Sequence, residues 1–228
     1  KLFYNGLGEF MFVNKLNFDF DSFMTIECIE APENRQDDKR PRDLYNIGND
    51  FHGNLIPVGG GKDSVVTLEA LQPMHEDSYC LQFNRSLYDK DRAALACIAE
   101  AGYSAEDTRN FNLSFDEHML ELNKQGFYNG HIPFSSTLAF AAIIVAYLSN
   151  KAYIEVSNEA SANESNVAGT NINHQYSKSY EFEKDFETYL QTYLCEKIHY
   201  FSFTFSTFEW LKIIETFFNI HIVFNLTV

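Results

Sequence analysis

The run Gly59-Gly60-Gly61-Lys62-Asp63-Ser64 holds the residue types best suited to chemistry in this sequence. Three successive glycines let backbone N–H groups converge on an anion, because no Cβ atom blocks the approach. A short apolar run precedes them at 54–58, and apolar residues at helical spacing follow over 63–71. The N–H groups would then lie at the positive end of a helix dipole. The pattern predicts a phosphate-binding loop; the alternative is an ordinary glycine-rich turn.

Two common phosphate-binding motifs do not fit this run. A Walker A loop requires Gly-x-x-x-x-Gly-Lys followed by Ser or Thr, but Ile56 occupies the first glycine position and Asp63 follows Lys62. A dinucleotide-binding Gly-x-Gly-x-x-Gly fingerprint would require a glycine at the position of Ser64. If the loop binds phosphate, it therefore does so as a member of another class of phosphate-binding turn.

Short apolar runs and helical patterns alternate on either side of this loop. The predicted strands are 54–58, 79–83 and 152–156, and the predicted helices are 63–71, 91–101, 135–149 and 181–194. Strands that alternate with helices are typical of a parallel sheet covered on both faces. We therefore expect an α/β fold, a three-layer sandwich with a mostly parallel sheet and the site at the carboxyl ends of its strands. Ser135 or Ser136 is expected to cap the helix 135–149.

Three regions are expected along the chain: a small β-rich N-terminal segment (1–50), a catalytic domain (51–200) and an atypical phenylalanine-rich tail (201–228). Apolar and polar residues alternate in 10–13 and 24–29, which indicates strands or hairpin arms. The polar, highly charged stretch 31–42 is the best candidate for a linker or surface loop. The first residues show neither a methionine nor a signal pattern, so we expect a fragment.

The charge, cysteine content and apolar runs of the sequence indicate which binding partners to expect. With 17 Lys and Arg against 32 Asp and Glu, the formal charge of −15 repels nucleic acids and anionic lipid surfaces. The four cysteines contain no Cys-x-x-Cys pair, so buried free thiols in a reducing compartment are expected instead of a zinc site. The longest apolar run, 138–148, is about 11 residues, short of the roughly 20 that span a bilayer. We expect a cytoplasmic protein with no nucleic-acid or membrane partner.

The glycine loop resembles the PP-loop signature Ser-Gly-Gly-x-Asp-Ser of ATP pyrophosphatases (the PP-loop/adenine nucleotide alpha hydrolase-like fold), with Gly59 at the usual Ser position. Proteins with this loop activate a carboxylate, amide or carbonyl by adenylation and release pyrophosphate. The resemblance implies ATP and Mg²⁺ as cofactors. The implied ATP-binding residues are Gly59, Gly60, Gly61, Lys62, Asp63 and Ser64. Among them, the glycine backbone and the Ser64 hydroxyl would hold the pyrophosphate, and Asp63 would bind the metal or fix the loop.

Three polar segments beyond the loop, 129–135, 157–164 and 173–179, narrow the resemblance. Together with the loop they resemble the ATP-dependent UDP-N-acetylmuramoyl-L-alanyl-L-glutamate epimerases of peptidoglycan precursor synthesis, over roughly residues 2–200. The resemblance implies a small-molecule substrate, UDP-MurNAc-L-Ala-L-Glu, whose terminal L-Glu is adenylated, epimerised to D-Glu and released with AMP and pyrophosphate. Adenylation removes the carboxylate charge that would oppose carbanion formation at Cα.

Epimerisation requires groups that remove and return a proton. Within the resemblance, His174 and His131 are the candidates for acid/base catalysis. Glu159 is the candidate for binding Mg²⁺, together with Asp63, or for binding substrate. Lys178 is the candidate for binding phosphate or carboxylate. Taken alone, each histidine fits a structural role in a loop equally well, and Lys178 alone fits a solvated surface residue.

Two alternatives to the epimerase stay open. One is another PP-loop adenylating ligase, which would release AMP without inverting a stereocentre. The other is a degenerate ATP-binding protein without turnover, because residues 204–228 contain no arginine where the resembled family is expected to carry one. Pyrophosphate release separates the last alternative from the other two, and product chirality separates the epimerase from the ligase.

Overall fold

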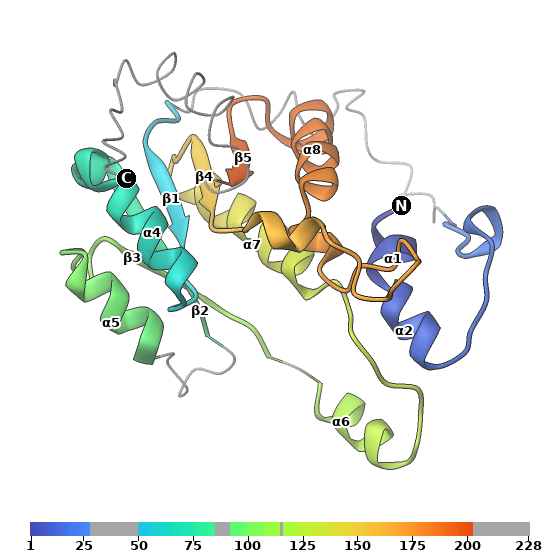
Figure 1. The fold of residues 1–228 in the computed structure, drawn as a ribbon. Helices are drawn as coiled ribbons and strands as arrows, with labels where there is room; N and C mark the ends of the chain where they lie inside the picture. The colour runs from blue at the N-terminus through green and yellow to red at the C-terminus, as the bar shows by residue number, and fades with distance from the viewer. Residues whose placement is uncertain (28–49, 85–91, 115, 203–228) are drawn as a thin grey trace, which may run out of the picture.

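Five parallel strands form one sheet in a computed structural model that describes residues 1–27, 50–84, 92–114 and 116–202. The strands are β1 (Asn54–Pro57), β2 (Ser78–Asn84), β3 (Thr108–Asn112), β4 (Tyr153–Val156) and β5 (His199–Ser202), in the order β3-β2-β1-β4-β5 (Figure 1). The chain builds outward from β1 through β2 to β3, then crosses to β4 on the other side. The strand order therefore reverses between β1 and β4, where open α/β sheets form a crevice at their carboxyl ends.

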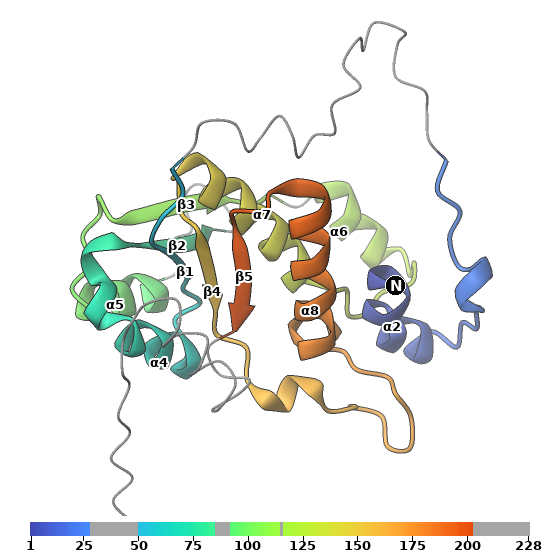
Figure 2. The same ribbon diagram turned by 90° about the horizontal axis from the view of Figure 1, so that it is seen from above.

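Helices cover both faces of the sheet. Helices α4 (Lys62–Ala70) and α5 (Arg92–Glu100) pack on one face, and α7 (Phe134–Leu148) and α8 (Tyr180–Tyr189) pack on the other (Figures 1 and 2). Neighbouring strand residues alternate between the two cores: Leu55 packs with α7 and α8, whereas Ile56 packs with α4 and α5. The expected three-layer parallel α/β sandwich is confirmed.

The predicted central elements match the structure within one or two residues at their ends, but two strands were not predicted. Strand β3 is polar at every position except Phe111 and lies at one edge of the sheet, and β5 is a four-residue strand at the other edge. The predicted helix 181–194 is confirmed as α8 followed by a π-helical turn, η5 (Leu190–Leu194), so its last five residues are not α-helical. Helix α6 (Glu117–Lys124) stands apart from the layers (Figure 1).

The expected β-rich N-terminal segment is wrong for the described residues 1–27. They contain α1 (Leu2–Gly6), α2 (Gly8–Val13) and a 3₁₀ turn, η1 (Phe20–Ser22). The apolar run 10–13 lies in α2, because a four-residue pattern does not distinguish a period of 2 from one of 3.6. In Figures 1 and 2, α2 lies beyond α8, on the side away from the sheet.

Close contacts hold these short helices against the domain. A Cβ at Gly6 would lie 2.5 Å from Cβ of Pro133, so glycine lets α1 approach the start of α7. The Lys1 ammonium contacts Glu181 at 2.8 Å and Asp185 at 2.7 Å on α8. The N-terminal helices thus face the segment that joins β4 to α8.

Other expectations have mixed outcomes. The predicted serine cap of α7 is wrong: Pro133 takes the N-cap position, and the Ser136 hydroxyl donates a hydrogen bond to the Pro133 carbonyl at 2.6 Å. Cys80 and Cys195 are buried free thiols, as expected, whereas Cys97 is a free thiol that is only partly buried. The predicted linker 31–42, Cys28 and residues 203–228 of the tail lie outside the described residues. In the described ranges no helix is long and apolar enough to cross a membrane.

Candidate active site

The glycine loop joins β1 to α4 at the reversal point of the sheet. Gly60 adopts a φ of +74°, and a Cβ there would lie 2.5 Å from the Ala94 backbone nitrogen at the start of α5. Gly60 is therefore required both for its conformation and for close packing. By contrast, a Cβ at Gly61 would meet no atom within 4 Å, and one at Gly59 would meet only the Ser64 hydroxyl, at 3.9 Å. The outer side of the loop is open to a ligand.

Buried hydroxyl groups fix the loop to the end of β4. The Gly59 N–H donates to the Ser64 hydroxyl at 3.1 Å, so Ser64 holds the turn closed. One turn further along α4, the fully buried Thr67 hydroxyl lies 3.2 Å from the Asp63 carbonyl and 2.8 Å from the Ser157 hydroxyl. The contact between Thr67 and Ser157 joins α4 to the residue that follows β4, and it helps to set the position of that segment.

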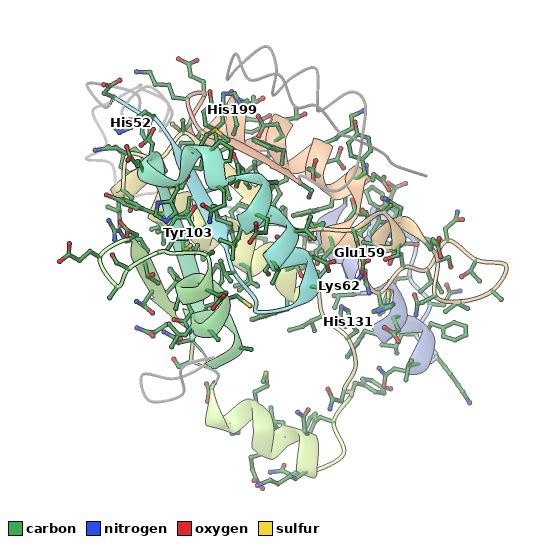
Figure 3. All side chains as sticks on the ribbon, turned by 60° about the vertical axis from the view of Figure 1, so that its left-hand side comes forward. His52, Lys62, Tyr103, His131, Glu159 and His199 are labelled. Atoms are coloured by element: carbon green, nitrogen blue, oxygen red, sulfur yellow. The ribbon has the colours of Figure 1, made fainter. Side chains whose placement is uncertain are left out.

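Lys62 connects two carboxylates across this crevice. Its ammonium donates to Glu159 at 3.0 Å and lies 3.4 Å from Asp63 (Figure 3). The hydrogen bond with Glu159, followed by the charge of Asp63, raises the Lys62 pKa; the same hydrogen bond lowers the Glu159 pKa. Lys62 and Glu159 are thus both charged at neutral pH. Because Lys62 and Glu159 are exposed, the pair is accessible to an anionic ligand.

A cavity of about 290 Å³ opens beside the loop, at the carboxyl ends of β1, β2 and β4. Its walls include Gly59, Phe83, Phe134 and Lys178. Such a cavity, mostly apolar with a few polar groups, is typical of small-ligand sites. The structure therefore places Lys178 with the glycine loop in one cleft.

His131 and His174 meet edge to face, with ring centroids 5.4 Å apart. Burial, and then the charge of His174, lowers the His131 pKa, with a smaller contribution from Lys178. His131 is therefore neutral at pH 7 and able to accept a proton. The Lys178 charge also contributes to the lowered Glu159 pKa, after the Lys62 terms. Lys178 thus lies within electrostatic range of both the histidine pair and the loop.

Two buried carboxyl groups near the site were not singled out from the sequence. Glu155, on β4, is fully buried, and burial raises its pKa well above the ordinary range. Glu183, on α8, is 2% exposed, and burial raises its pKa to about 7. Glu155 could have been noticed in the sequence, because it is a glutamate within the apolar run Tyr153–Val156. No local pattern marks Glu183.

Asp63 and Glu159 are the only sequence-predicted metal ligands, and Lys62 lies between them. Among residues 1–27, 50–84, 92–114 and 116–202, no group of three or more His, Cys, Asp or Glu side chains could hold a metal ion by itself. Mg²⁺ usually binds one or two carboxylates, with phosphate oxygens and water completing the shell. The pair fits such a shared site, in which nucleotide phosphates provide the remaining ligands.

The fold and site together define an α/β domain of the PP-loop type, with its glycine loop at the strand-order reversal. A family model described as the MurL N-terminal domain matches residues 1–203, and the chain belongs to this family.

Curated relatives carry one name, UDP-N-acetyl-alpha-D-muramoyl-L-alanyl-L-glutamate epimerase. The protein of Xanthomonas oryzae pv. oryzae is 33% identical over 203 residues, which cover 88% of this chain and 41% of that protein. The Micromonospora sp. protein is 31% identical over 183 residues, covering 78% of this chain and 36% of its own length. The Salinispora tropica protein is 35% identical over 141 residues, which cover 60% of this chain and 29% of that protein. The chain thus spans less than half the length of these relatives.

Solved structures give distant matches. An NH3-dependent NAD synthetase from Campylobacter jejuni has a TM-score of 0.34 and 13% identity, covering 53% of this chain and 52% of its own. A predicted subunit of a tRNA methyltransferase from Methanocaldococcus jannaschii has a TM-score of 0.36 and 11% identity. The match covers 73% of this chain and 76% of that chain.

Proposed function

We propose that this chain is the ATP-binding part of an enzyme that epimerises the terminal L-Glu of UDP-MurNAc-L-Ala-L-Glu to D-Glu, releasing AMP and pyrophosphate. The observation that carries the proposal is the open glycine loop at the β1–β4 crevice, with Lys62 and Glu159 facing each other across it. Membership of the family and the names of the curated relatives support the same substrate.

The loop fits the phosphates of ATP. The missing Cβ atoms at Gly59 and Gly61 leave space for phosphate oxygens beside backbone N–H groups at the start of α4. Lys62 provides a cation for the same oxygens. Mg²⁺, held by Asp63 and Glu159, would neutralise phosphate charge when bound. The neighbouring 290 Å³ cavity, with its apolar walls, is suited to the rest of the nucleotide.

ATP would convert the glutamate α-carboxylate into an acyl adenylate with loss of pyrophosphate, which makes the Cα proton easier to remove. After inversion, water would hydrolyse the adenylate to the free carboxylate and AMP. The neutral His131 imidazole can accept that proton, with His174 placed to pass it on. Because the two rings touch, they cannot hold Cα between them, so the pair acts on one side of Cα. A different group then returns a proton to the opposite side of Cα. Lys178 binds the carboxylate or a phosphate in the cleft.

The proposal is tested by incubating the protein with ATP, Mg²⁺ and UDP-MurNAc-L-Ala-L-Glu, then measuring AMP, pyrophosphate and the chirality of glutamate released by hydrolysis. D-Glu with stoichiometric AMP supports the epimerase. AMP with retained L-Glu replaces it with another PP-loop adenylating ligase, and ATP binding without AMP replaces it with a degenerate ATP-binding protein.

A further inference from the structure

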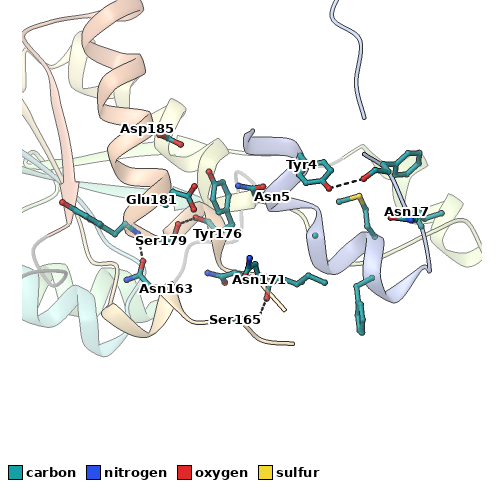
Figure 4. A pocket seen from close by; sticks show the side chains of 18 of the residues that line it. Tyr4, Asn5, Asn17, Asn163, Ser165, Asn171, Tyr176, Ser179, Glu181 and Asp185 are labelled. Carbon is teal, nitrogen blue, oxygen red and sulfur yellow. Dashed lines mark hydrogen bonds between the residues drawn. The ribbon is translucent and has the colours of Figure 1, made fainter. Parts of the chain in front are cut away.

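A second, larger cavity of about 1340 Å³ lies between the N-terminal helices and the segment that follows β4. Its walls come from α1, α2 and the chain up to Phe18 on one side, and from residues 163–185 on the other (Figure 4). The glycine loop does not line it. The N-terminal helices thus complete a cavity that the α/β layers do not form by themselves.

The amide groups of its lining suit a polar ligand with hydroxyl and amide functions. Five asparagines line it: Asn5, Asn17, Asn163, Asn171 and Asn173. An asparagine amide both donates and accepts hydrogen bonds, as hydroxyl and acetamido groups require. Tyr4, Phe18, Tyr176 and Tyr180 add aromatic rings, which pack against the apolar faces of ligands while remaining compatible with water.

The asparagines divide into two sets. Asn163 and Asn173 brace the loop: Asn163 donates to the Ala160 carbonyl at 3.1 Å, and Asn173 donates to the Ala162 carbonyl at 2.7 Å. The side-chain amides of Asn17 and Asn171 form no hydrogen bond with any described residue, so both are available to a ligand. Four charged side chains line the cavity. Glu181 and Asp185 both pair with Lys1, whereas Lys15 and Lys184 have no ion pair within the described chain. They provide positive charge for a diphosphate.

This cavity adjoins the candidate active site through the turn η4 (Tyr176–Lys178). Tyr176 lines the large cavity, whereas Lys178 lines the smaller cleft beside the glycine loop. His174 directly follows Asn173, another lining residue, and Glu9, within electrostatic range of His131, directly follows the lining residue Gly8. A ligand in the large cavity can therefore extend one end toward the histidine pair.

We propose that the large cavity binds the UDP-hexosamine part of the substrate, with Asn17 and Asn171 bound to the sugar and Lys15 and Lys184 near the diphosphate. The inference rests on the proposed function and assigns its substrate a binding place. Ligand cavities are usually about 300–1,000 Å³, and this one exceeds that range. Its size is more than an alanyl-glutamate dipeptide requires, and it accommodates a nucleotide sugar. The dipeptide then extends past Asn173 to the histidines while ATP occupies the glycine loop.

The test uses UDP-N-acetylmuramic acid, which lacks the reacting dipeptide, and ATP as separate probes in calorimetric titrations. The double variant Asn17→Ala/Asn171→Ala is expected to weaken binding of UDP-N-acetylmuramic acid about tenfold, because two ligand hydrogen bonds are lost. Its ATP affinity is expected to match that of the unmodified chain. Asn123→Ala, an exposed amide on α6 remote from both cavities, is the matched control and should change neither affinity.

Hydrogen exchange locates the bound probe. UDP-N-acetylmuramic acid is expected to slow exchange in residues 8–18 and 163–173, and ATP in residues 59–64. Unchanged affinity in the double variant, or slowing confined to 59–64, overturns the cavity assignment and leaves the epimerase proposal standing. Binding of ATP without any binding of UDP-N-acetylmuramic acid or of the complete substrate overturns the proposed substrate, and the cavity assignment with it.

Discussion

The Lys62 ammonium lies 3.0 Å from the Glu159 carboxylate, joining residues 97 positions apart across the reversal point of the sheet. Lys62 opens α4 directly after the glycine loop, and Glu159 lies three residues beyond β4. Because both side chains are exposed, the ion pair adds little to folding stability. In the proposed function, the pair holds a cation and a carboxylate where nucleotide phosphates and Mg²⁺ would bind.

Replacing Lys62 tests this function. Lys62→Met is expected to lower AMP formation on the order of 10²-fold, because a charge-stabilising donor is lost. The melting temperature should stay unchanged. Lys124→Met is the matched control, since Lys124 pairs with Glu121 at 3.1 Å on the distant helix α6. Equal rates for Lys62→Met and Lys124→Met would contradict a role for Lys62 in the reaction.

The three glycines are expected to respond differently to substitution. Gly60→Ala should destabilise the fold by about 1–3 kcal/mol, because a Cβ would strain a φ of +74° and collide with the Ala94 backbone. Gly59→Ser, which restores the residue usual in PP-loops, should leave stability unchanged, since only the Ser64 hydroxyl lies within 4 Å. Urea unfolding of both variants measures the difference, and equal midpoints would refute the packing argument.

The histidine pair predicts a shift in the pH profile. A lowered His131 pKa keeps the base neutral below its ordinary pKa, so activity should persist into mildly acidic conditions. His174→Asn removes a positive charge that lowers this pKa, so the acidic limb of the rate profile should move to higher pH. His131→Asn should abolish inversion but leave ATP binding intact. An acidic limb that does not move in His174→Asn would argue against His131 as the base.

Glu183 predicts loss of stability as pH rises. Its pKa of about 7 in the folded state exceeds the ordinary 4.5, so the fold favours the protonated carboxyl group. The stabilisation is complete below pH 4.5 and is lost as pH rises through 7, with roughly 2–3 kcal/mol as an upper limit. Compared with the unmodified chain, Glu183→Gln should raise the melting temperature more at pH 8 than at pH 5. Glu69→Gln, at an exposed position on α4, is the control and should leave the profile unchanged.

Local patterns in the sequence were sufficient for the core of the domain. The glycine loop between an apolar run and a helical pattern placed β1 and α4, and the alternation of strands and helices predicted the parallel sheet. Residues 10–13 failed as a strand prediction because four residues carry too little periodicity. Strand β3 was missed because Phe111 is its only apolar residue, and β5 was missed because four residues are too few to show a period.

The tertiary structure decided which of these residues meet. The order β3-β2-β1-β4-β5 brings Glu159 beside Lys62, and only the packing of α4 on β4, through Thr67 and Ser157, sets their separation. The contact of His131 with His174 and the burial of Glu183 depend in the same way on how distant elements pack. Sequence determines local conformation through backbone geometry and periodicity, whereas the site is assembled by long-range contacts that no local pattern encodes.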